Sequence, residues 1–279
     1  MSPALSSDLV GLKGDPVPYS WDSKDVLLYN FGIGCRPYDD IDFLFEGKGP
    51  KVVPTFAVIG GMAGMGVMGK LEGINPVMIL HGGESITLHR ELPPQAKVTL
   101  QGELTELWDK GQAAVIGLTT TASDDDGPLF TATASIFARG SGGFGGERGP
   151  STKGVNAPPE REPDHVIPDE TRPEQAAIYR LSGDRNPLHI DPEFAKMGGF
   201  DTPILHGLCT YGFVGRAILK ALCGNDPAKF KSFEGRFSDV VYPGDTIITK
   251  MWVDGNEAIV QAETQKGNAV LSGAKATFE

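Results

Sequence analysis

The sequence divides into two halves with the same pattern of strands, and one segment poor in apolar residues separates them. That segment, residues 141–159, lies within the run RGSGGFGGERGPSTKGVNAPP, which is dominated by Gly, Ser, Pro and charged residues. Such a composition cannot bury enough apolar surface to stay compact, so it is typical of a linker. We therefore predict a first half over residues 1–140, a linker over 141–159 and a second half over 160–279.

Both halves contain runs in which apolar and polar residues alternate. The first half has SITLHRELPPQAKVTLQGELTEL, QAAVIGLTTTAS and FTATASIFA, and the second has FSDVVYPGDTIITKMWV, EAIVQAETQ and AVLSGAKATF. Alternation with many Val, Ile, Thr and Phe residues predicts half-buried antiparallel strands. The tetrapeptide ILHG, at residues 79–82 and 204–207, precedes strands in each half. We predict an α+β fold made of two copies of one β-rich unit.

The two copies differ in the residues that come after ILHG. In the second half, LCTYGFVGRAILKALCG places apolar residues at steps of three and four, which predicts a helix with one buried face, ended by Gly224 and Pro227. In the first half GGES leads almost directly into a strand, so no helix is predicted there. The second sheet should wrap around a long helix, while the first should leave an apolar groove able to hold a long ligand.

Charge and cysteine usage exclude several classes of protein. A net charge of −11 argues against sequence-independent nucleic-acid binding, which needs clustered Lys and Arg. The three cysteines, Cys35, Cys209 and Cys223, form no CxxC pair, so neither a disulfide scaffold nor a zinc site is expected. No apolar run is long enough to span a membrane, and neither a secretory signal nor a C-terminal SKL address is present.

The stretch YRLSGDRNPLHID concentrates polar residues around Pro187. Asn186 precedes that proline and is therefore disfavoured from helical geometry, so we predict a bent loop after a helical lead-in over residues 174–181. The bend would let Asp184 and His189 face one cavity. A carboxylate and an imidazole that converge can activate water, and Asn186 can orient that water without titrating. An ordinary surface turn is the alternative, because Asp and Asn also favour turns.

Gly207, in the second ILHG, is predicted at the N-terminus of the second-half helix. Free N–H groups and the helix dipole favour negative charge there, and a glycine lets a carbonyl oxygen approach the backbone closely. An acid/base pair next to such a backbone site suits chemistry beside a thioester or another carbonyl.

The motif Y-x-L-S-G-D-x-N-P-L-H-x-D, from Tyr179 to Asp191, resembles the signature of the MaoC-like, R-specific enoyl-CoA hydratase family, and FDTPILHGLCTYG is similar to the segment that begins that family's helix. The whole chain resembles the hydratase 2 region of yeast peroxisomal multifunctional enzymes type 2. The resemblance implies a double hot-dog fold and the hydration of trans-2-enoyl-CoA to (3R)-3-hydroxyacyl-CoA in fatty acid β-oxidation. It implies that Asp184 and His189 are the catalytic pair, that Asn186 helps to hold the water or the product hydroxyl, and that the Gly207 amide receives the thioester oxygen.

The resemblance also implies how the protein works and where. Because CoA is part of the substrate, no cofactor and no metal are expected. The protein is expected to be a peroxisomal homodimer that acts on medium and long acyl chains, fused to a 3R-hydroxyacyl-CoA dehydrogenase region in a longer chain. The first half departs from the motif: LYNFGIGC echoes IYRLSGD, but the counterpart of Asp184 is about Gly34. That half should bind the acyl chain and not catalyse.

Candidate residues for substrate binding lie in both halves. Phe56 and Met65, in VVPTFAVI and MAGMGVM, are predicted to line the acyl groove, and VVPTFAVIG has the composition of a strand. Affinity should then rise by up to ~0.8 kcal/mol for each buried methylene. Arg185, with Arg180 and Lys196 nearby, is a candidate for contact with the CoA phosphates.

Two other kinds of site are weaker interpretations. Gly64, Gly66 and Gly69 match G-x-G-x-x-G, but no periodic helix follows, so a dinucleotide site is not favoured. His189, Asp191 and His206 could imitate a two-His, one-carboxylate iron site.

ILHG recurs with His81 and without an H-x-D partner, which favours a packed structural histidine at His206; the residue is also kept as a substrate-contact candidate. Two rival functions stay open: an acyl-CoA thioesterase on the same fold and a non-catalytic acyl-CoA binding module. The positions of Asn186 and His189 relative to Asp184 argue against both.

Overall fold

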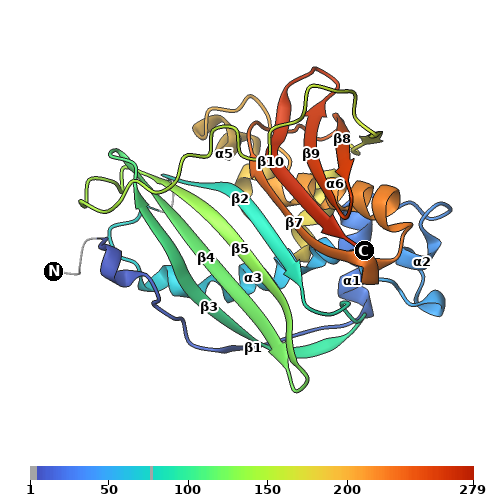
Figure 1. Ribbon diagram of the computed structural model, residues 1–279, viewed down its shortest axis with the longest axis horizontal. Coiled ribbons are helices and arrows are strands. Elements are labelled where there is room, and N and C mark those ends of the chain that lie inside the picture. The colour runs from blue at the N-terminus through green and yellow to red at the C-terminus, as the bar shows by residue number, and fades with distance from the viewer. Residues whose placement is uncertain (1–4, 76–77) are drawn as a thin grey trace.

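Ten strands form one continuous antiparallel sheet in the computed structural model, which describes residues 5–75 and 78–279 (Figure 1). The strands are β1 (Val17–Trp21), β2 (Ile79–Leu88), β3 (Ala96–Asp109), β4 (Ala113–Asp124), β5 (Gly127–Arg139), β6 (His165–Glu170), β7 (Phe230–Phe237), β8 (Thr246–Asp254), β9 (Glu257–Thr264) and β10 (Ala269–Phe278). Their order is β1-β3-β4-β5-β2-β7-β10-β9-β8-β6. The first five strands belong to the first half of the sequence and the last five to the second, so β2 and β7 join the two half-sheets.

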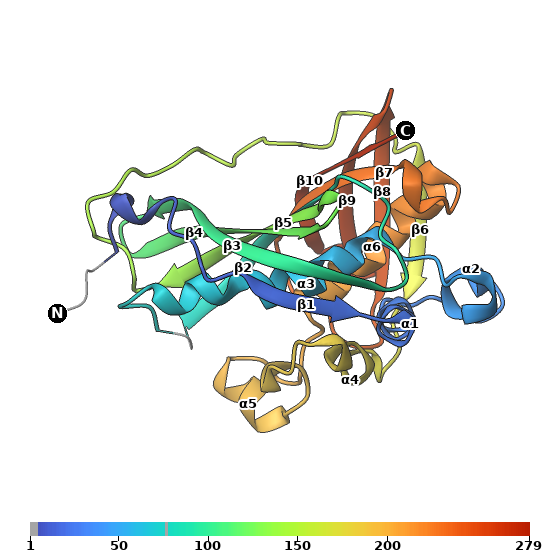
Figure 2. The same cartoon turned by 90° about the horizontal axis from the view of Figure 1, so that it is seen from below.

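The helices lie on one side of this sheet, as Figure 2 shows. They are α1 (Ser23–Gly32), α2 (Ile41–Leu44), α3 (Ala57–Gly64), α4 (Gln175–Tyr179), α5 (Pro192–Met197) and α6 (Gly207–Cys223). Helix α3 runs beneath the first half-sheet and α6 beneath the second, while α4 and α5 project further from the strands. The arrangement confirms the α+β class and the two similar halves.

The long helix of the second half is confirmed. Helix α6 begins at Gly207 and ends at Cys223, and it is capped by Gly224, whose left-handed φ of 60° suits a glycine. Its apolar side chains are buried in the main core, where Tyr211 also donates its hydroxyl to the Phe233 carbonyl of β7 at 2.6 Å. Among the described residues, no helix is both long enough and apolar enough to cross a membrane.

The first half-sheet is covered differently from what the sequence predicts. No helix follows the first ILHG, which opens strand β2, and no helix among the described residues of the first half is as long as α6. A shorter helix, α3, lies before that copy, between two 3-10 turns at Pro54–Phe56 and Met65–Lys70. The two ILHG copies therefore occupy different elements. The strand predicted for VVPTFAVIG is wrong, because a short apolar run does not distinguish a buried strand from a buried helix by periodicity.

Helix α3 touches the sheet through glycines. A Cβ at Gly60 would stand 2.7 Å from the Phe130 ring, and one at Gly61 would stand 2.8 Å from the Ala132 methyl group. Thr120 of β4 donates its hydroxyl to the Gly61 carbonyl at 3.0 Å. This close approach closes the space between α3 and the sheet at these positions.

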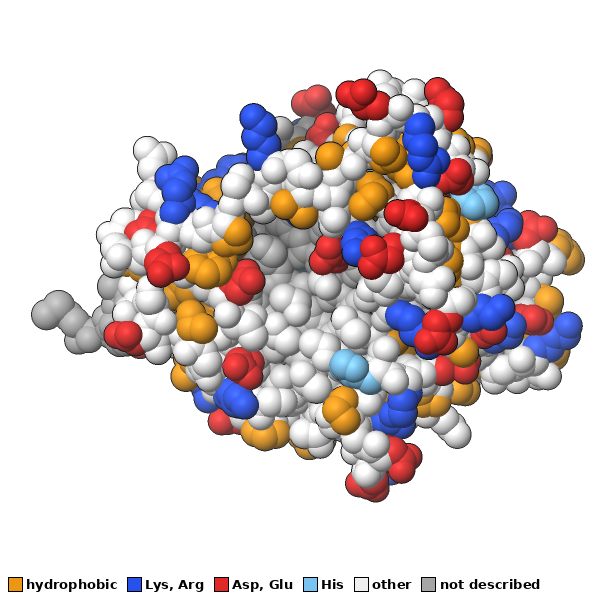
Figure 3. Space-filling model, in the orientation of Figure 1, with side chains coloured by type: hydrophobic (Ala, Val, Ile, Leu, Met, Phe, Trp, Pro, Cys, Tyr) orange, Lys and Arg blue, Asp and Glu red, His pale blue; other side chains and the backbone are white. Residues whose placement is uncertain are grey.

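The outer face of the sheet is polar. In β4 and β5 the buried positions hold Ala, Leu and Ile, and the alternate positions that face outward include Thr119, Thr133 and Ser135. Figure 3 shows this face as a hollowed surface with few apolar side chains in its floor. A tight turn joins the end of β4 at Asp124 to the start of β5 at Gly127.

The segment between β5 and β6 runs without a helix or strand, and all of its residues are described. It is held to the sheet by the Asp109 carboxylate, which accepts hydrogen bonds from the amides of Gly143 at 2.9 Å and Gly145 at 2.8 Å. Further along, the side-chain amide of Asn156 donates a hydrogen bond to the carboxylate of Glu234 in β7 at 2.8 Å.

Candidate active site

The polar motif of the second half forms a bent loop after a helical lead-in. Helix α4 and a 3-10 turn at Arg180–Ser182 lead to Gly183, whose φ of 141° is accessible to glycine and strained for other residues. The Asp184 carboxylate then accepts a hydrogen bond from the backbone N–H of Asn186 at 3.1 Å. The side-chain oxygen of Asn186 in turn accepts one from the backbone N–H of Leu188 at 3.0 Å. The same residue types thus supply the turn and leave polar atoms for chemistry.

Three titratable side chains meet at this loop. Asp184, His189 and His206 each place a potential ligand atom within 4.8 Å of the others. The rings of His189 and His206 stack with their centroids 3.7 Å apart and their planes inclined by 28°. Both histidines are buried and Asp184 is half-buried. The structure therefore brings the two predicted catalytic side chains to one place.

His189 is held in one tautomer by the backbone. Its Nδ1 lies 2.9 Å from the Ile204 carbonyl oxygen, which can only accept, so Nδ1 carries the proton and Nε2 the lone pair. Burial lowers the pKa of His189, although the Ile204 hydrogen bond and the charge of Asp184 oppose that shift. The imidazole is therefore neutral near pH 7 and can take up a proton at Nε2.

His206 is a neutral histidine that supports the loop. Its Nε2 donates to the backbone carbonyl of Asp184 at 3.1 Å, which leaves an unprotonated Nδ1 without a partner among the described residues. Burial, and then the neighbouring His189, lower the pKa of His206 to about 3. Its ring also lies 5.0 Å from that of Tyr179, centroid to centroid. These contacts are those expected of a packed, hydrogen-bonded structural histidine.

We expect His206 to make the protein sensitive to acid. Its pKa is about 3 in the folded chain and 6.5 ordinarily, so the unfolded chain binds a proton that the folded chain does not. The free energy of unfolding should fall as the pH drops from 6.5 towards 3. Urea unfolding of the wild type and of His206→Gln, at about pH 7 and about pH 4.5, measures this change. The free energy of unfolding should fall less in His206→Gln than in the wild type. An equal loss of stability in the two proteins would contradict the role of His206 in acid sensitivity.

The three-residue cluster fits proton transfer better than metal binding. A metal ion must lie in the plane of each imidazole that binds it, whereas the His189 and His206 rings are stacked in nearly parallel planes. Asp191, the carboxylate of the alternative iron interpretation, instead caps α5 by accepting the amides of Glu193 and Phe194. That interpretation is therefore wrong for Asp191.

Gly207 begins α6 as predicted, directly after His206. No side chain caps this helix, and the first amides of any helix have no partner within it. The Phe237 ring lies 3.3 Å from the position that a Cβ at Gly207 would take. A larger residue would press on this ring, whereas glycine leaves both the ring and the helix start undisturbed.

The predicted substrate-binding residues lie in different surroundings. Phe56 is 3% exposed and packs between the rings of Trp21 and Tyr29, at centroid distances of 5.6 and 5.4 Å. Met65 packs against a second apolar cluster, which includes Val67 and Leu104. A charged residue at Phe56 would therefore disrupt the core as well, and the role of Phe56 and Met65 in lining an acyl groove stays a prediction.

Met62, not singled out from the sequence, is the α3 residue that comes close to the motif. Its ε-methyl group lies 3.9 Å from the position that a Cβ at Gly183 would take. Arg185 is exposed, and its guanidinium forms no hydrogen bond or ion pair with any residue that the structure describes. Contact between Arg185 and a CoA phosphate stays a prediction. Asn186 is exposed as well, beside Asp184.

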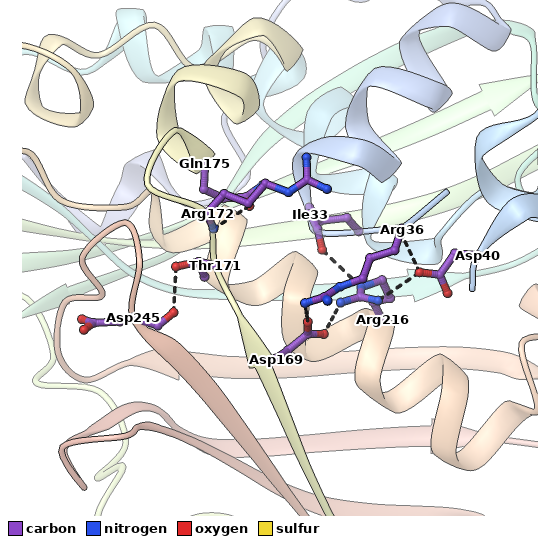
Figure 4. Close-up of polar contacts among 9 residues, drawn as sticks. All are labelled: Ile33, Arg36, Asp40, Asp169, Thr171, Arg172, Gln175, Arg216 and Asp245. Atoms are coloured by element: carbon purple, nitrogen blue, oxygen red, sulfur yellow. Dashed lines mark hydrogen bonds and ion pairs between the residues drawn. The ribbon is translucent and has the colours of Figure 1, made fainter. Parts of the chain in front are cut away.

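The C-terminal end of α1 supports both elements that carry the site. The Gly32 carbonyl accepts the Gln175 side-chain amide of α4 at 2.6 Å and the Cys209 thiol of α6 at 3.4 Å. The next carbonyl, of Ile33, accepts Nε of Arg216 in α6 at 3.2 Å (Figure 4). The first half therefore fixes the positions of α4 and α6, although it carries no counterpart of Asp184.

Arg216 continues this support as a buried ion-pair network. Its guanidinium binds Asp40 at 3.3 Å and also pairs with Asp169, which lies 3.8 Å from Arg36. Arg36 and Asp40 come from the first half, and Asp169 comes from β6. Burial raises the pKa of Asp169, and Arg216 and Arg36 oppose the shift. Sequence reasoning missed this network because its members are scattered over 180 residues with no common motif.

Two half-sheets, each curved over a helix and joined through β2 and β7, define a double hot-dog protein with its polar site on the second half. Residues 19–140 match the family described as MFE-2 hydratase 2 N-terminal domain, and residues 155–274 match the MaoC like domain. The chain belongs to the MaoC-like hydratase 2 family.

Individual relatives agree with this assignment. A crystal structure of a MaoC-like dehydratase from Phytophthora capsici superposes with a TM-score of 0.87 and 32% identity, covering 99% of this chain and 98% of that one. A probable enoyl-CoA hydratase 2 of Dictyostelium discoideum is 40% identical over 97% of this chain and 95% of its own length. A peroxisomal hydratase-dehydrogenase-epimerase of Neurospora crassa is 41% identical over 98% of this chain, which spans only 31% of that protein.

Proposed function

We propose that this protein is an R-specific 2-enoyl-CoA hydratase, which reversibly adds water to a trans-2-enoyl-CoA to give a (3R)-3-hydroxyacyl-CoA. The observation that carries the proposal is the meeting of Asp184 with the neutral, buried His189 beside the uncapped helix start at Gly207. The names of the relatives from Dictyostelium and Neurospora point to the same chemistry.

The proposed reaction needs only these groups and one water molecule. The Asp184 carboxylate and the side-chain amide of Asn186 hold the water. His189 Nε2 removes a proton from this water as the water oxygen bonds to C3. The C2=C3 electron pair moves towards the thioester carbonyl, and the imidazolium then returns the proton to C2. Water is thus divided between C3 and C2, His189 ends as it began, and no cofactor takes part.

The Gly207 amide is proposed to stabilise the enolate that forms between these two steps. Negative charge grows on the thioester oxygen as the hydroxyl group adds to C3, and an N–H fixed at a helix start can donate to it. The rings of His189 and His206 beside it are buried, so this hydrogen bond would be stronger than it is in water.

We expect syn addition and a 3R product, because water and the transferred proton come from one pair of side chains on one face of the double bond. The test is to incubate the protein with trans-2-decenoyl-CoA, follow the loss of the enoyl absorbance, and determine the chirality of the product. An S product would move the protein to another class of hydratase. Free CoA released as fast as the enoyl signal disappears would favour the thioesterase, and no reaction would favour the binding module.

The wider setting is also part of the proposal. Relatives from Neurospora crassa and Arabidopsis thaliana are named as peroxisomal, which supports a peroxisomal location and a role in fatty acid β-oxidation. The Neurospora relative is about three times as long as this chain, which is consistent with fusion to a 3R-hydroxyacyl-CoA dehydrogenase region. Medium or long acyl chains and a homodimer are proposed on the family resemblance.

A further inference from the structure

A half-buried histidine and a buried carboxylate form a pair on β2, outside the motif of the second half. His81 Nε2 lies 3.0 Å from Glu84 Oε2, and Glu84 is only 6% exposed. In a regular strand, residues three apart point to opposite faces of the sheet. A bulge between His81 and Gly83 shifts the register against β5, so both side chains reach the same side.

The pair is connected to the site through one aromatic ring. The His81 ring meets the Phe237 ring edge to face, with centroids 5.3 Å apart and planes at 82°. The Phe237 ring also lies against Gly207, because it is 3.3 Å from the position that a Cβ at Gly207 would take. Glu84, His81, Phe237 and Gly207 therefore form an unbroken row of contacts across the β2–β7 junction.

Glu84 gives this row a fixed direction. Burial raises the pKa of the Glu84 carboxyl, and its hydrogen bond with His81 opposes the shift. A buried carboxyl that bonds one ring nitrogen of an imidazole sets both the tautomer and the rotation of the ring. The His81 ring is thereby held against Phe237, and Phe237 is held against the backbone of Gly207.

We propose that His81 and Glu84 are positioning residues that aim the Gly207 amide at the thioester oxygen by bracing Phe237. The inference rests on the proposed function, because it presumes that this amide meets the oxygen of an acyl-CoA. A displaced donor stabilises the enolate less, while the CoA and acyl contacts that bind the substrate are unchanged. Loss of the brace should therefore lower kcat and leave KM nearly the same.

The test compares Glu84→Leu, His81→Leu and Phe237→Leu with the conservative variant Glu84→Gln. Each of the three leucine variants should lower kcat for trans-2-decenoyl-CoA by about 10-fold or more, because removal of a whole oxyanion donor costs 10²–10³-fold. Glu84→Gln can still bond His81 and should keep most of the activity. His89→Leu is the matched control, since it removes another hydrogen-bonded imidazole, 2.9 Å from Thr131, just past the end of β2 and about 25 Å from His81.

A second measurement reads the hydrogen bond itself. Decanoyl-CoA labelled with ¹³C at C1 cannot be hydrated, and the infrared stretch of its thioester carbonyl falls when the oxygen accepts a hydrogen bond. Bound to the wild type, Glu84→Gln and His89→Leu, the carbonyl should absorb at a lowered frequency. In the three leucine variants it should move back towards the value of free decanoyl-CoA.

The outcomes separate this inference from the proposed function. Folded leucine variants with unchanged kcat and carbonyl frequency would overturn the bracing role while the hydratase stands, and a loss of kcat without a frequency change would do the same. Should Glu84→Leu fail to fold, Phe237→Leu decides by the same two readouts. An equal loss in Glu84→Gln would assign proton transfer to Glu84 and reject positioning. A wild type that neither hydrates nor lowers the frequency would overturn both proposals.

Discussion

Replacing Asp184 by Asn, or His189 by Gln, is expected to lower the rate of hydration by at least ~100-fold, the scale of positioned general acid–base catalysis. Each change keeps the size of the side chain and removes the group that holds the water or takes its proton. The two losses should not add in the double variant, because the pair acts as one unit. The measurement is kcat/KM for trans-2-decenoyl-CoA in purified, folded protein.

The pH dependence gives an independent check on His189. As the base, it must be neutral, so activity should fall on the acid side as it becomes protonated. Burial lowers its pKa, so this fall should lie below the ordinary histidine value of 6.5. Asp201→Asn and His165→Gln serve as controls, because they change the same residue types outside the cluster and should retain activity. Near-normal turnover in folded Asp184→Asn or His189→Gln would remove the pair from the mechanism.

Replacing Arg216 by Met is expected to destabilise the protein by ~3–5 kcal/mol, because it leaves the carboxylates of Asp40 and Asp169 buried without their shared cation. Arg36 lies 3.8 Å from Asp169 and can offset only part of this loss. Equilibrium unfolding in urea measures the change in the free energy of unfolding. Activity should fall as well, since Arg216 joins α6 to the end of α1.

The control for this prediction is Arg36→Met in the same network. The Arg36 side chain is 51% exposed, so its ion pair is screened by solvent and should contribute less than ~1 kcal/mol. If Arg216→Met proved no more harmful than Arg36→Met, burial of the pair would not matter to stability. That result would also mean that Arg216 is not needed to hold α6 against α1.

The motif itself determined the local part of the site. Asp184 and His189 are five residues apart, and Pro187 between them excludes a continuous helix, so the bend follows from the local sequence. The start of α6 at Gly207 followed in the same way from the period of its apolar residues. Short-range backbone preferences decide such features, and they can be read from the residues alone.

Helix α3 shows where this kind of reading fails. Its run of apolar residues and glycines has no clear period, and the repeated ILHG suggested an alignment of the halves that the fold does not follow. The run is a helix because Gly60 and Gly61 allow it to lie directly on β4 and β5. That choice depends on the surface beneath the segment, which the segment does not encode.

The sequence by itself thus determined the class of fold, the two halves and the Asp184–His189 pair, because each rests on residue patterns within short stretches. Only the tertiary structure decided that His206 stacks on His189, that Arg216 ties α6 to α1, and that His81 and Glu84 reach Gly207 through Phe237. These contacts join segments separated by tens to hundreds of residues. A one-residue bulge in β2 is enough to send a side chain to the opposite face, so only the packed sheet fixes which groups meet.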